Sequence, residues 1–406
     1  MKKTWLIIVV CVLAVALAAC THPEQTETAT RTQTTTVLTE PSVPTVPTDP
    51  TDPTDPTVPT ELNWKTNVLR SDAISYQSEN EFEWSDEAAQ YPVFGSEYTR
   101  AQIRTVTFVT SLSEAPEDAW DVSAGGDYSV MAWVIPVGPR YDLYIGADGG
   151  INAWQACEDL FAGYHNVLQI DFGQHFHTEG ATHMSRMFLG CGSLTSLSIP
   201  DFDTSKVFEM DLMFGWCRSL TSLDLKGFDT SSVLTMCRMF YYCDSLTELD
   251  LSSWDTGNVV NMDGVFGDCH ALRDLNLDGV ETGNVVTMSG LFHSCESLEM
   301  LDLSSFDTGM VEDMWGMFCF CKSLKSLDIS SFDTRNVTTM NSMFAGCESL
   351  TGLQLDHFDT SNVTDMMYMF DGCPSVTIDD VRHFNTDKVT ANYNFMAGSD
   401  WWFLFE

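Results

Sequence analysis

A cysteine that returns every 26 residues constrains the fold of this chain more than any other feature. The series is Cys191, Cys217, Cys243, Cys269, Cys295, Cys321, Cys347 and Cys373, with no insertion between its members. The residues between the cysteines repeat as well. A fixed period of this length is typical of stacked repeats, in which each unit buries its apolar face only against its neighbours.

Each unit has two halves with different hydrophobic periods. After the cysteine come three leucines, as in Leu246, Leu249 and Leu251, and the last two alternate with polar residues. This alternation predicts a short strand with one buried face. Later in the unit, apolar residues are spaced by three and four positions, as between Val337 and Phe344. That spacing predicts a short helix.

A corner of sequence Phe-Asp-Thr separates the two halves. Its threonine is present in all eight copies, from Thr204 to Thr386. Asp and Thr before an apolar helical stretch are typical of helix N-termini and tight turns. The unit therefore follows the leucine-rich-repeat plan of strand, corner and short helix. The predicted fold class is α/β: a leucine-rich-repeat-type solenoid of about nine such 26-residue coils, with a β-rich N-terminal cap.

The repeats also resemble a known family. The Leu-x-x-Leu-x-Leu strand, the Phe-Asp-Thr-Ser-Asn-Val corner and the Met-x-x-Met-Phe-x-x-Cys segment are similar to those of the BspA-like leucine-rich repeat surface proteins of bacteria. The resemblance begins near Tyr91 and extends to the C-terminus. It implies an elongated domain displayed outside the cell that functions in adhesion or protein binding, without a defined reaction.

The N-terminus predicts export. Lys2 and Lys3 precede an apolar stretch that is too short to span a bilayer comfortably, which is typical of a secretory signal. The stretch ends in Leu-Ala-Ala-Cys, similar to a bacterial lipoprotein cleavage site, so we expect a signal peptide over 1–19 and lipidation of Cys20. Plain signal cleavage with an incidental cysteine is the alternative. Two lipid chains would suffice for stable anchoring to the outer face of the cell envelope.

Four further regions follow the signal peptide. Residues 20–60 are rich in Thr and Pro, and prolines recur at every third position from Pro41 to Pro59, which predicts an extended or disordered stalk. Residues 61–156 form the predicted cap region, with candidate strands at Ile103–Val109, Tyr128–Ile135 and Tyr141–Ile145. The solenoid is expected over 157–399. Its last coil degenerates at Asp379, and the aromatic residues 400–406 are expected to cover its end.

The net charge of −39 excludes one class of partner and favours another. Nucleic-acid binding depends on basic contacts to phosphates, so we expect no nucleic-acid partner. The charge also disfavours contact with anionic lipid, so the membrane is reached through the lipid anchor only. An extracellular protein or glycan, one with a basic surface by preference, is the expected partner.

Two rows of acidic residues repeat with the coils. The corner row should accept hydrogen bonds from the following backbone N–H groups; it contains Asp203, Asp229, Asp255, Glu281, Asp307, Asp333 and Asp359. The second row lies between the two strand leucines and faces outward, and no local hydrogen-bonding role explains it. A solvated face would account for it, but it is also the candidate binding face, formed by Asp224, Asp250, Asn276, Asp302 and Asp328.

The cysteines and histidines offer little chemistry. The eight repeating cysteines continue the buried stripe, so we expect buried thiols in place of a disulfide ladder. No compact zinc motif is present, and we predict no cofactor and no structural metal. His175, His177, Glu179 and His183 could hold a metal, but His177 occupies the corner position of an Asp, so a variant corner is the preferred interpretation.

Three functions remain open. The leading prediction is a lipid-anchored adhesion or binding protein. An architectural spacer without a specific ligand is the alternative. A surface glycosidase would need one distinct pair of carboxylates. Because the acids repeat uniformly, we predict no enzyme activity and assign no catalytic residue.

Overall fold

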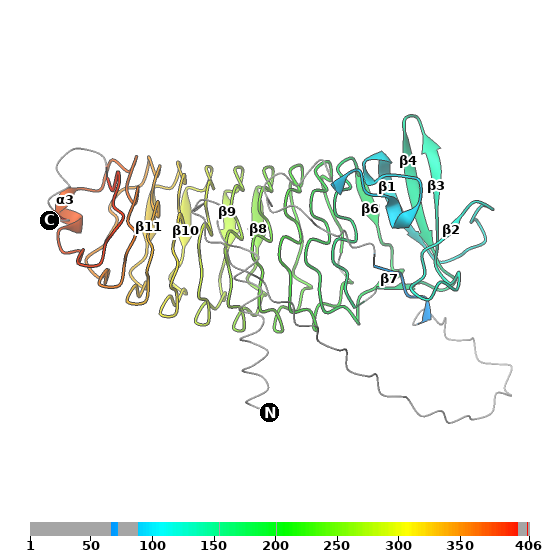
Figure 1. Cartoon of the computed structure of the whole chain (residues 1–406), viewed down its shortest axis with the longest axis horizontal. Helices are drawn as coiled ribbons and strands as arrows, with labels where there is room; N and C mark the ends of the chain where they lie inside the picture. Colours follow the sequence, from blue (N-terminus) through cyan, green and yellow to red (C-terminus); the bar gives the residue numbers. More distant parts are fainter. Residues whose placement is uncertain (1–65, 72–87, 154, 200, 397–403, 405–406) are drawn as a thin grey trace, which may run out of the picture.

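The computed structural model describes residues 66–71, 88–153, 155–199, 201–396 and 404. The predicted signal peptide, Cys20 and the stalk lie outside the described residues. Figure 1 shows an elongated molecule, with a β-rich region at one end, a long series of stacked coils, and the C-terminal residues at the other end. No helix within the described part of the chain is long and apolar enough to cross a membrane.

The N-terminal region contains most of the regular strands. Its elements are η3 (Val93–Gly95), η4 (Arg100–Gln102), β1 (Ile103–Val109), β2 (Trp120–Asp121), β3 (Met131–Val137), β4 (Arg140–Gly146) and β5 (Ile151–Asn152). The strand predicted at Ile103–Val109 is confirmed as β1, and the one predicted at Tyr141–Ile145 is confirmed within β4. The prediction Tyr128–Ile135 overlaps β3 but is displaced toward the N-terminus.

The sheet of this region continues into the first coil. Its strand order is β2-β3-β4-β1-β6, where β6 (Gln169–Asp171) belongs to the coil. β1 pairs with β6 in parallel, with Val106 opposite Ile170. β1 therefore occupies the edge that the first coil would otherwise expose. The arginine of η4, Arg100, is buried and donates to Asp159 O at 2.9 Å, which fixes the sheet to the coil.

The coils are joined by a ladder of parallel backbone bridges. The ladder runs through Ala156, His183, Glu209, Thr235, Asn261, Thr287, Asp313, Thr339, Asp365 and Ala391. From His183 onward the members are 26 residues apart, as the cysteine period predicts. The first step is 27 residues, because one extra residue lies in this coil. The chain thus builds a continuous stack of repeat coils.

The predicted strands form in the first coil, as β6, and again in the middle of the stack. Those in the middle are β8 (Glu248–Asp250), β9 (Asp274–Asn276), β10 (Met300–Asp302) and β11 (Ser326–Asp328). β8 pairs with β9, and β10 with β11, both in parallel. In flanking coils the equivalent leucines, such as Leu223 and Leu353, are buried without forming a strand. A separate short strand, β7 (Phe176–His177), pairs with β5.

The prediction of a short helix in each coil is wrong. Within the described coil residues 155–199 and 201–396, the only α-helix is α3 (Ile378–Val381). The segment that carries the Val, Met and Phe stripe instead forms successive turns, with two residues of positive φ in each coil. The first position is held by Arg186, Leu212, Arg238, Gly264, Gly290, Gly316, Ser342, Tyr368 and Asn394, and the second by Gly190, Trp216, Tyr242, Asp268, Ser294, Phe320, Gly346 and Gly372.

Positive φ interrupts a right-handed helix and redirects the backbone N–H groups. The N–H of Phe188 donates to Met213 O at 2.9 Å, and the N–H of Phe214 donates to Met239 O at 2.9 Å. These bonds reach the next coil, while intervening N–H groups close turns within their own coil, as Met187 does with Met184 O. The apolar stripe of Val, Met and Phe still points inward. Successive turns can give the same spacing of three and four residues that indicated a helix.

One row of stacked phenylalanine rings runs through the core. It is formed by Phe161, Phe188, Phe214, Phe240, Phe266, Phe292, Phe318, Phe344 and Phe370, with successive ring centroids 5.5–5.9 Å apart. The repeating cysteines lie beside this row, buried and without disulfide bonds, as predicted. Each thiol from Cys191 to Cys347 contacts a phenylalanine carbonyl, as Cys217 Sγ does with Phe188 O at 3.3 Å. Burial raises the pKa of Cys217 to about 12, so it remains a thiol.

The last coil departs from the repeat. The strand leucines are replaced around Asp379, and α3 forms there, with Thr377 and Asp380 in a capping box. Of the predicted aromatic cap 400–406, only Leu404 is among the described residues. Thr386 Oγ1 donates to Leu404 O at 2.6 Å, and Leu404 packs against the core. This contact places Leu404 against the last coil.

Candidate binding face

The outward row predicted from the sequence lies along one face of the stack. The strand leucine beside each of its residues points into the core. Leu249, for example, has 3% of its surface exposed. The neighbouring outward residues Asp224, Asn276, Asp302 and Asp328 are exposed, and Asp250 is half-buried. The parallel register sets Asp250 opposite Asn276 and Asp302 opposite Asp328. The structure therefore brings all five residues to one surface.

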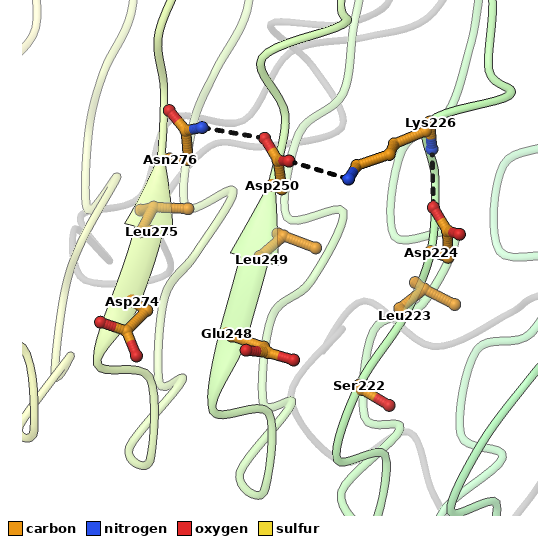
Figure 2. Close-up of a pocket in the computed structure, with 10 residues that line it drawn as sticks. All are labelled: Ser222, Leu223, Asp224, Lys226, Glu248, Leu249, Asp250, Asp274, Leu275 and Asn276. Carbon is orange, nitrogen blue, oxygen red and sulfur yellow. Dashed lines mark hydrogen bonds and ion pairs between the residues drawn. The ribbon is translucent and has the colours of Figure 1, made fainter.

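An open depression of about 620 Å³ lies on this face. Figure 2 shows its lining residues, which come from three successive coils. They are Ser222, Leu223, Asp224, Lys226, Glu248, Leu249, Asp250, Asp274, Leu275 and Asn276. Three of the five predicted residues, Asp224, Asp250 and Asn276, line the depression, whereas Asp302 and Asp328 lie in the coils beyond it.

Sequence reasoning missed two acids of the depression. Glu248 and Asp274 are exposed and stand opposite each other in the β8–β9 register. Two carboxylates in facing positions repel each other, and no cation contacts either of them in the described structure. The alternation that directs Asp250 outward also directs Glu248 outward. The signal was therefore present in the sequence, but in a column that does not repeat strictly.

The statement that no local hydrogen bond explains the outward row is wrong. Each side chain accepts a hydrogen bond from the backbone N–H two residues ahead, which turns the chain at the end of the strand. The acceptor–donor pairs are Asp224–Lys226, Asp250–Ser252, Asn276–Asp278, Asp302–Ser304 and Asp328–Ser330, at 2.9–3.2 Å. This turn uses Oδ1 of each side chain, so the four aspartates keep Oδ2 for other contacts and Asn276 keeps its Nδ2 amide group.

These turns also affect ionisation. Hydrogen bonds from the Ser252 hydroxyl and N–H lower the pKa of Asp250. The Ser304 N–H and hydroxyl lower the pKa of Asp302, and the Ser330 hydroxyl and N–H lower the pKa of Asp328. These three carboxylates are therefore ionised at neutral pH, and the face carries negative charge.

Lys226 is the cation of the depression. Its Nζ lies 3.3 Å from Asp250 Oδ2, and its side chain is 66% exposed (Figure 2). Asp250 also accepts from Asn276 Nδ2 at 3.0 Å, so it joins three coils. Exposed ion pairs of this kind contribute at most about 1 kcal/mol. A basic group from a partner could therefore displace Lys226 at little cost.

The corner row behaves as predicted at six of its seven positions. The acids Asp203, Asp229, Asp255, Asp307, Asp333 and Asp359 accept a hydrogen bond from the N–H two residues ahead. No helix follows the corner, however, so the predicted interaction with a helix N-terminus is wrong. The buried corner threonines make a second ladder that was not predicted: Thr308 Oγ1 donates to Asp333 O and accepts from its N–H.

The four residues singled out as a possible metal cluster do not come together as a set. His177 lies in β7, and Thr178 after it donates to Asp203 O at 3.1 Å, as the corner threonines do. Residues 176–178 are thus a variant corner, as preferred from the sequence. In the described part of the chain, one group of three metal-ligating side chains lies within 4.8 Å, and it contains His183 with Glu158 and Glu209.

The stack of 26-residue coils defines a repeat protein. The chain belongs to the family described as "Mycoplasma protein of unknown function, DUF285", which matches residues 155–278, 245–327 and 321–400. These matches cover the coils and leave the N-terminal sheet outside. No curated protein matches the sequence.

A solved structure, described as "Crystal structure of TLR13-ssRNA13 complex", is similar to this chain at 15% sequence identity and a TM-score of 0.19. The alignment covers 58% of this chain and 42% of that chain. The chain therefore spans less than half the length of that protein. A match at this TM-score carries no inference about the present fold or its ligands.

Proposed function

We propose that this chain is a lipid-anchored cell-surface protein of the BspA-like kind, whose coils form a leucine-rich-repeat-type solenoid of about nine units. In this proposal the solenoid binds an extracellular protein or glycan through the acidic face. The observation that carries it is the depression on that face, which is lined by Asp224, Glu248, Asp250, Asp274 and one lysine, Lys226, whose side chain pairs with Asp250.

The chemistry of the depression favours a basic partner. The turns use one carboxylate oxygen of Asp224 and one of Asp250. They do not use the carboxylates of Glu248 and Asp274. Complementary charge mainly accelerates association and selects the partner, and it weakens as salt screens it. A partner that presents Lys or Arg side chains would pair with the free carboxylates and replace the weak Lys226 contact.

The test begins with a screen of the chain from Thr21 onward against extracellular matrix proteins and microbial surface polysaccharides. For each binder, affinity is measured for wild type and for the double variant Glu248→Gln and Asp274→Asn. We expect the double variant to bind at least tenfold more weakly and Lys226→Gln to bind more tightly. Neither substitution touches a turn or the core, so folding should be unchanged.

The matched control is the double variant Glu114→Gln and Glu117→Gln, which removes two charges from an exposed loop of the N-terminal region. It should leave the affinity unchanged, because we expect the position of the removed charges, and not the loss of net charge, to weaken binding. Equal weakening by this control would mean that the overall charge, and not the face, drives binding. Undiminished affinity in the double variant would remove the face from consideration.

An architectural role is the second candidate. It is favoured by the turn bonds of the outward row, since these give the repeated Asp a structural purpose without a ligand. It predicts no saturable binding in the screen. An enzymatic role has no such support, and we propose that the chain has no catalytic activity and needs no cofactor.

Export and anchoring are proposed from the sequence alone. Mass spectrometry of the chain made in a bacterial host should find diacylglycerol on Cys20, and Cys20→Ser should release the protein from the membrane fraction. Wild-type protein recovered without lipid would contradict anchoring and leave the binding proposal untouched.

A further inference from the structure

We propose that Glu158, His183 and Glu209 form a binding site for a first-row divalent transition metal, such as Zn²⁺, at the first coils of the stack. The three side chains are half-buried, and their ligand atoms lie within 4.8 Å of one another. Metal–nitrogen and metal–oxygen distances are about 2.0–2.2 Å, so small rotations of the two glutamates would bring all three onto one ion.

The backbone holds the three residues in place. His183 is bridged to Ala156, the second residue before Glu158, and to Glu209 in the next coil. The N–H of Cys157 donates to His183 O at 2.9 Å, and the N–H of Met184 donates to Glu209 O at 3.0 Å. The ligands therefore come from neighbouring coils of a hydrogen-bonded ladder, and a bound ion would join those coils.

The hydrogen bonds of Thr182 set the state of the histidine ring. The Thr182 hydroxyl lies 3.2 Å from Gln155 O and 2.9 Å from His183 Nδ1. A carbonyl oxygen only accepts, so the hydroxyl uses its one hydrogen there and accepts from Nδ1–H. The lone pair of the neutral ring is then on Nε2, which leaves that nitrogen available to a metal. Such a hydrogen bond on the other nitrogen is typical of metal-ligating histidines.

The charges around the site also favour a cation. The neighbouring cation, Arg186, is held by Asp159 in a two-pronged ion pair at 2.8 and 3.2 Å. Glu158 and Glu209 are brought within 4.8 Å of the same imidazole, so their two negative charges repel each other. A divalent ion would relieve that repulsion.

The donor set selects the kind of metal. One imidazole with two carboxylates suits Zn²⁺ and similar ions, whereas Ca²⁺ and Mg²⁺ prefer oxygen ligands alone. The site is also specific to this part of the stack. The next ladder positions hold Thr235, Asn261 and Thr287, so no imidazole recurs beside two carboxylates there. It lies where the 27-residue step interrupts the regular period.

The test uses the purified full chain, stripped of metal with a chelator. Titration with Zn²⁺ should give one binding event per chain and raise the melting temperature, while Mg²⁺ at equal concentration should do neither. His183→Gln and Glu209→Gln should each weaken Zn²⁺ binding at least tenfold. His175→Gln, a nearby histidine outside the cluster, is the matched control and should bind Zn²⁺ like wild type.

Two further measurements keep the outcome decisive. In chelator, the melting temperatures of the variants should equal that of the wild type, which separates lost metal binding from misfolding. If His183→Gln fails to fold, Glu158→Gln serves in its place. Co²⁺ in the site should give d–d bands without a thiolate charge-transfer band. Absence of binding, full binding by Glu158→Gln and Glu209→Gln, or a thiolate band would overturn the proposal.

Discussion

At the scale of single residues, the corner threonines connect neighbouring coils most directly. Thr308 is fully buried, donates to Asp333 O at 3.0 Å and accepts from the Asp333 N–H at 2.8 Å. The same arrangement recurs at Thr204, Thr256, Thr282 and Thr334. One buried hydroxyl thus bonds with both the backbone N–H and the backbone C=O of a residue in the next coil.

Replacing this hydroxyl by a methyl group should be costly. Thr308→Val keeps the shape of the side chain but leaves the buried N–H and C=O of Asp333 without this partner, so we expect a loss of about 1–3 kcal/mol in the free energy of unfolding. Thr308→Ser, which retains the hydroxyl, is the matched control and should lose less. Chemical denaturation measures both. Equal stability of Thr308→Val and wild type would contradict the role assigned to the ladder.

At the scale of the repeat element, the sequence predicts which residues of a coil are buried and which face outward. It does not predict the backbone conformation of the coil. Period, buried stripe and outward row all follow from spacing, because inward positions must be apolar in every coil. The helix prediction failed because positive φ at Leu212 and Trp216, which are not glycines, has no signal in a single sequence. Likewise, Glu158 and Glu209 lie about 50 residues apart, and only the stacked coils bring them to His183.

The stacked rings make each element depend on its neighbours. Phe292 is fully buried, and its ring lies 5.5 Å from that of Phe266 and 5.7 Å from that of Phe318. Phe292→Ala should therefore destabilise the protein by about 3–5 kcal/mol, through lost burial and a cavity. Phe292→Leu, which fills most of the space, should cost clearly less. A loss below about 1 kcal/mol for the alanine variant, measured by thermal or chemical denaturation, would argue against a tightly packed row.

At the scale of the whole molecule, the ionisation of one buried carboxyl should lower the free energy of unfolding as pH rises from about 4 to about 7. Asp263 is 5% exposed, and burial raises its pKa from 3.8 to about 7, while Arg238 opposes the shift and Asp313 adds to it. The folded state thus prefers the protonated form. This contribution is fully present below pH 3.8 and is lost as pH rises through about 7. Repulsion within a chain of net charge −39 acts in the same direction.

The variant that tests this is Asp263→Asn, which cannot ionise. Between pH 5 and 8 the wild type should lose more stability than the variant, by a difference on the order of 4 kcal/mol at most. Glu117→Gln removes a charge from an exposed loop and should follow the wild-type curve. Parallel curves for wild type and Asp263→Asn would show that this carboxyl is not perturbed by folding.

The binding face is also a property of the whole stack, since no coil alone contains it. Residues 222–226 and the strands at 248–250 and 274–276 meet there only because three coils align. The proposed function requires that a partner docks on this surface.

Amide hydrogen exchange of the chain, free and saturated with a binder from the screen, measures this directly. The account predicts added protection concentrated in residues 222–226, 248–250 and 274–276, with the corner from Asp229 to Asp333 unchanged. Protection confined to the corner, to the N-terminal sheet or to the opposite side of the coils would contradict it.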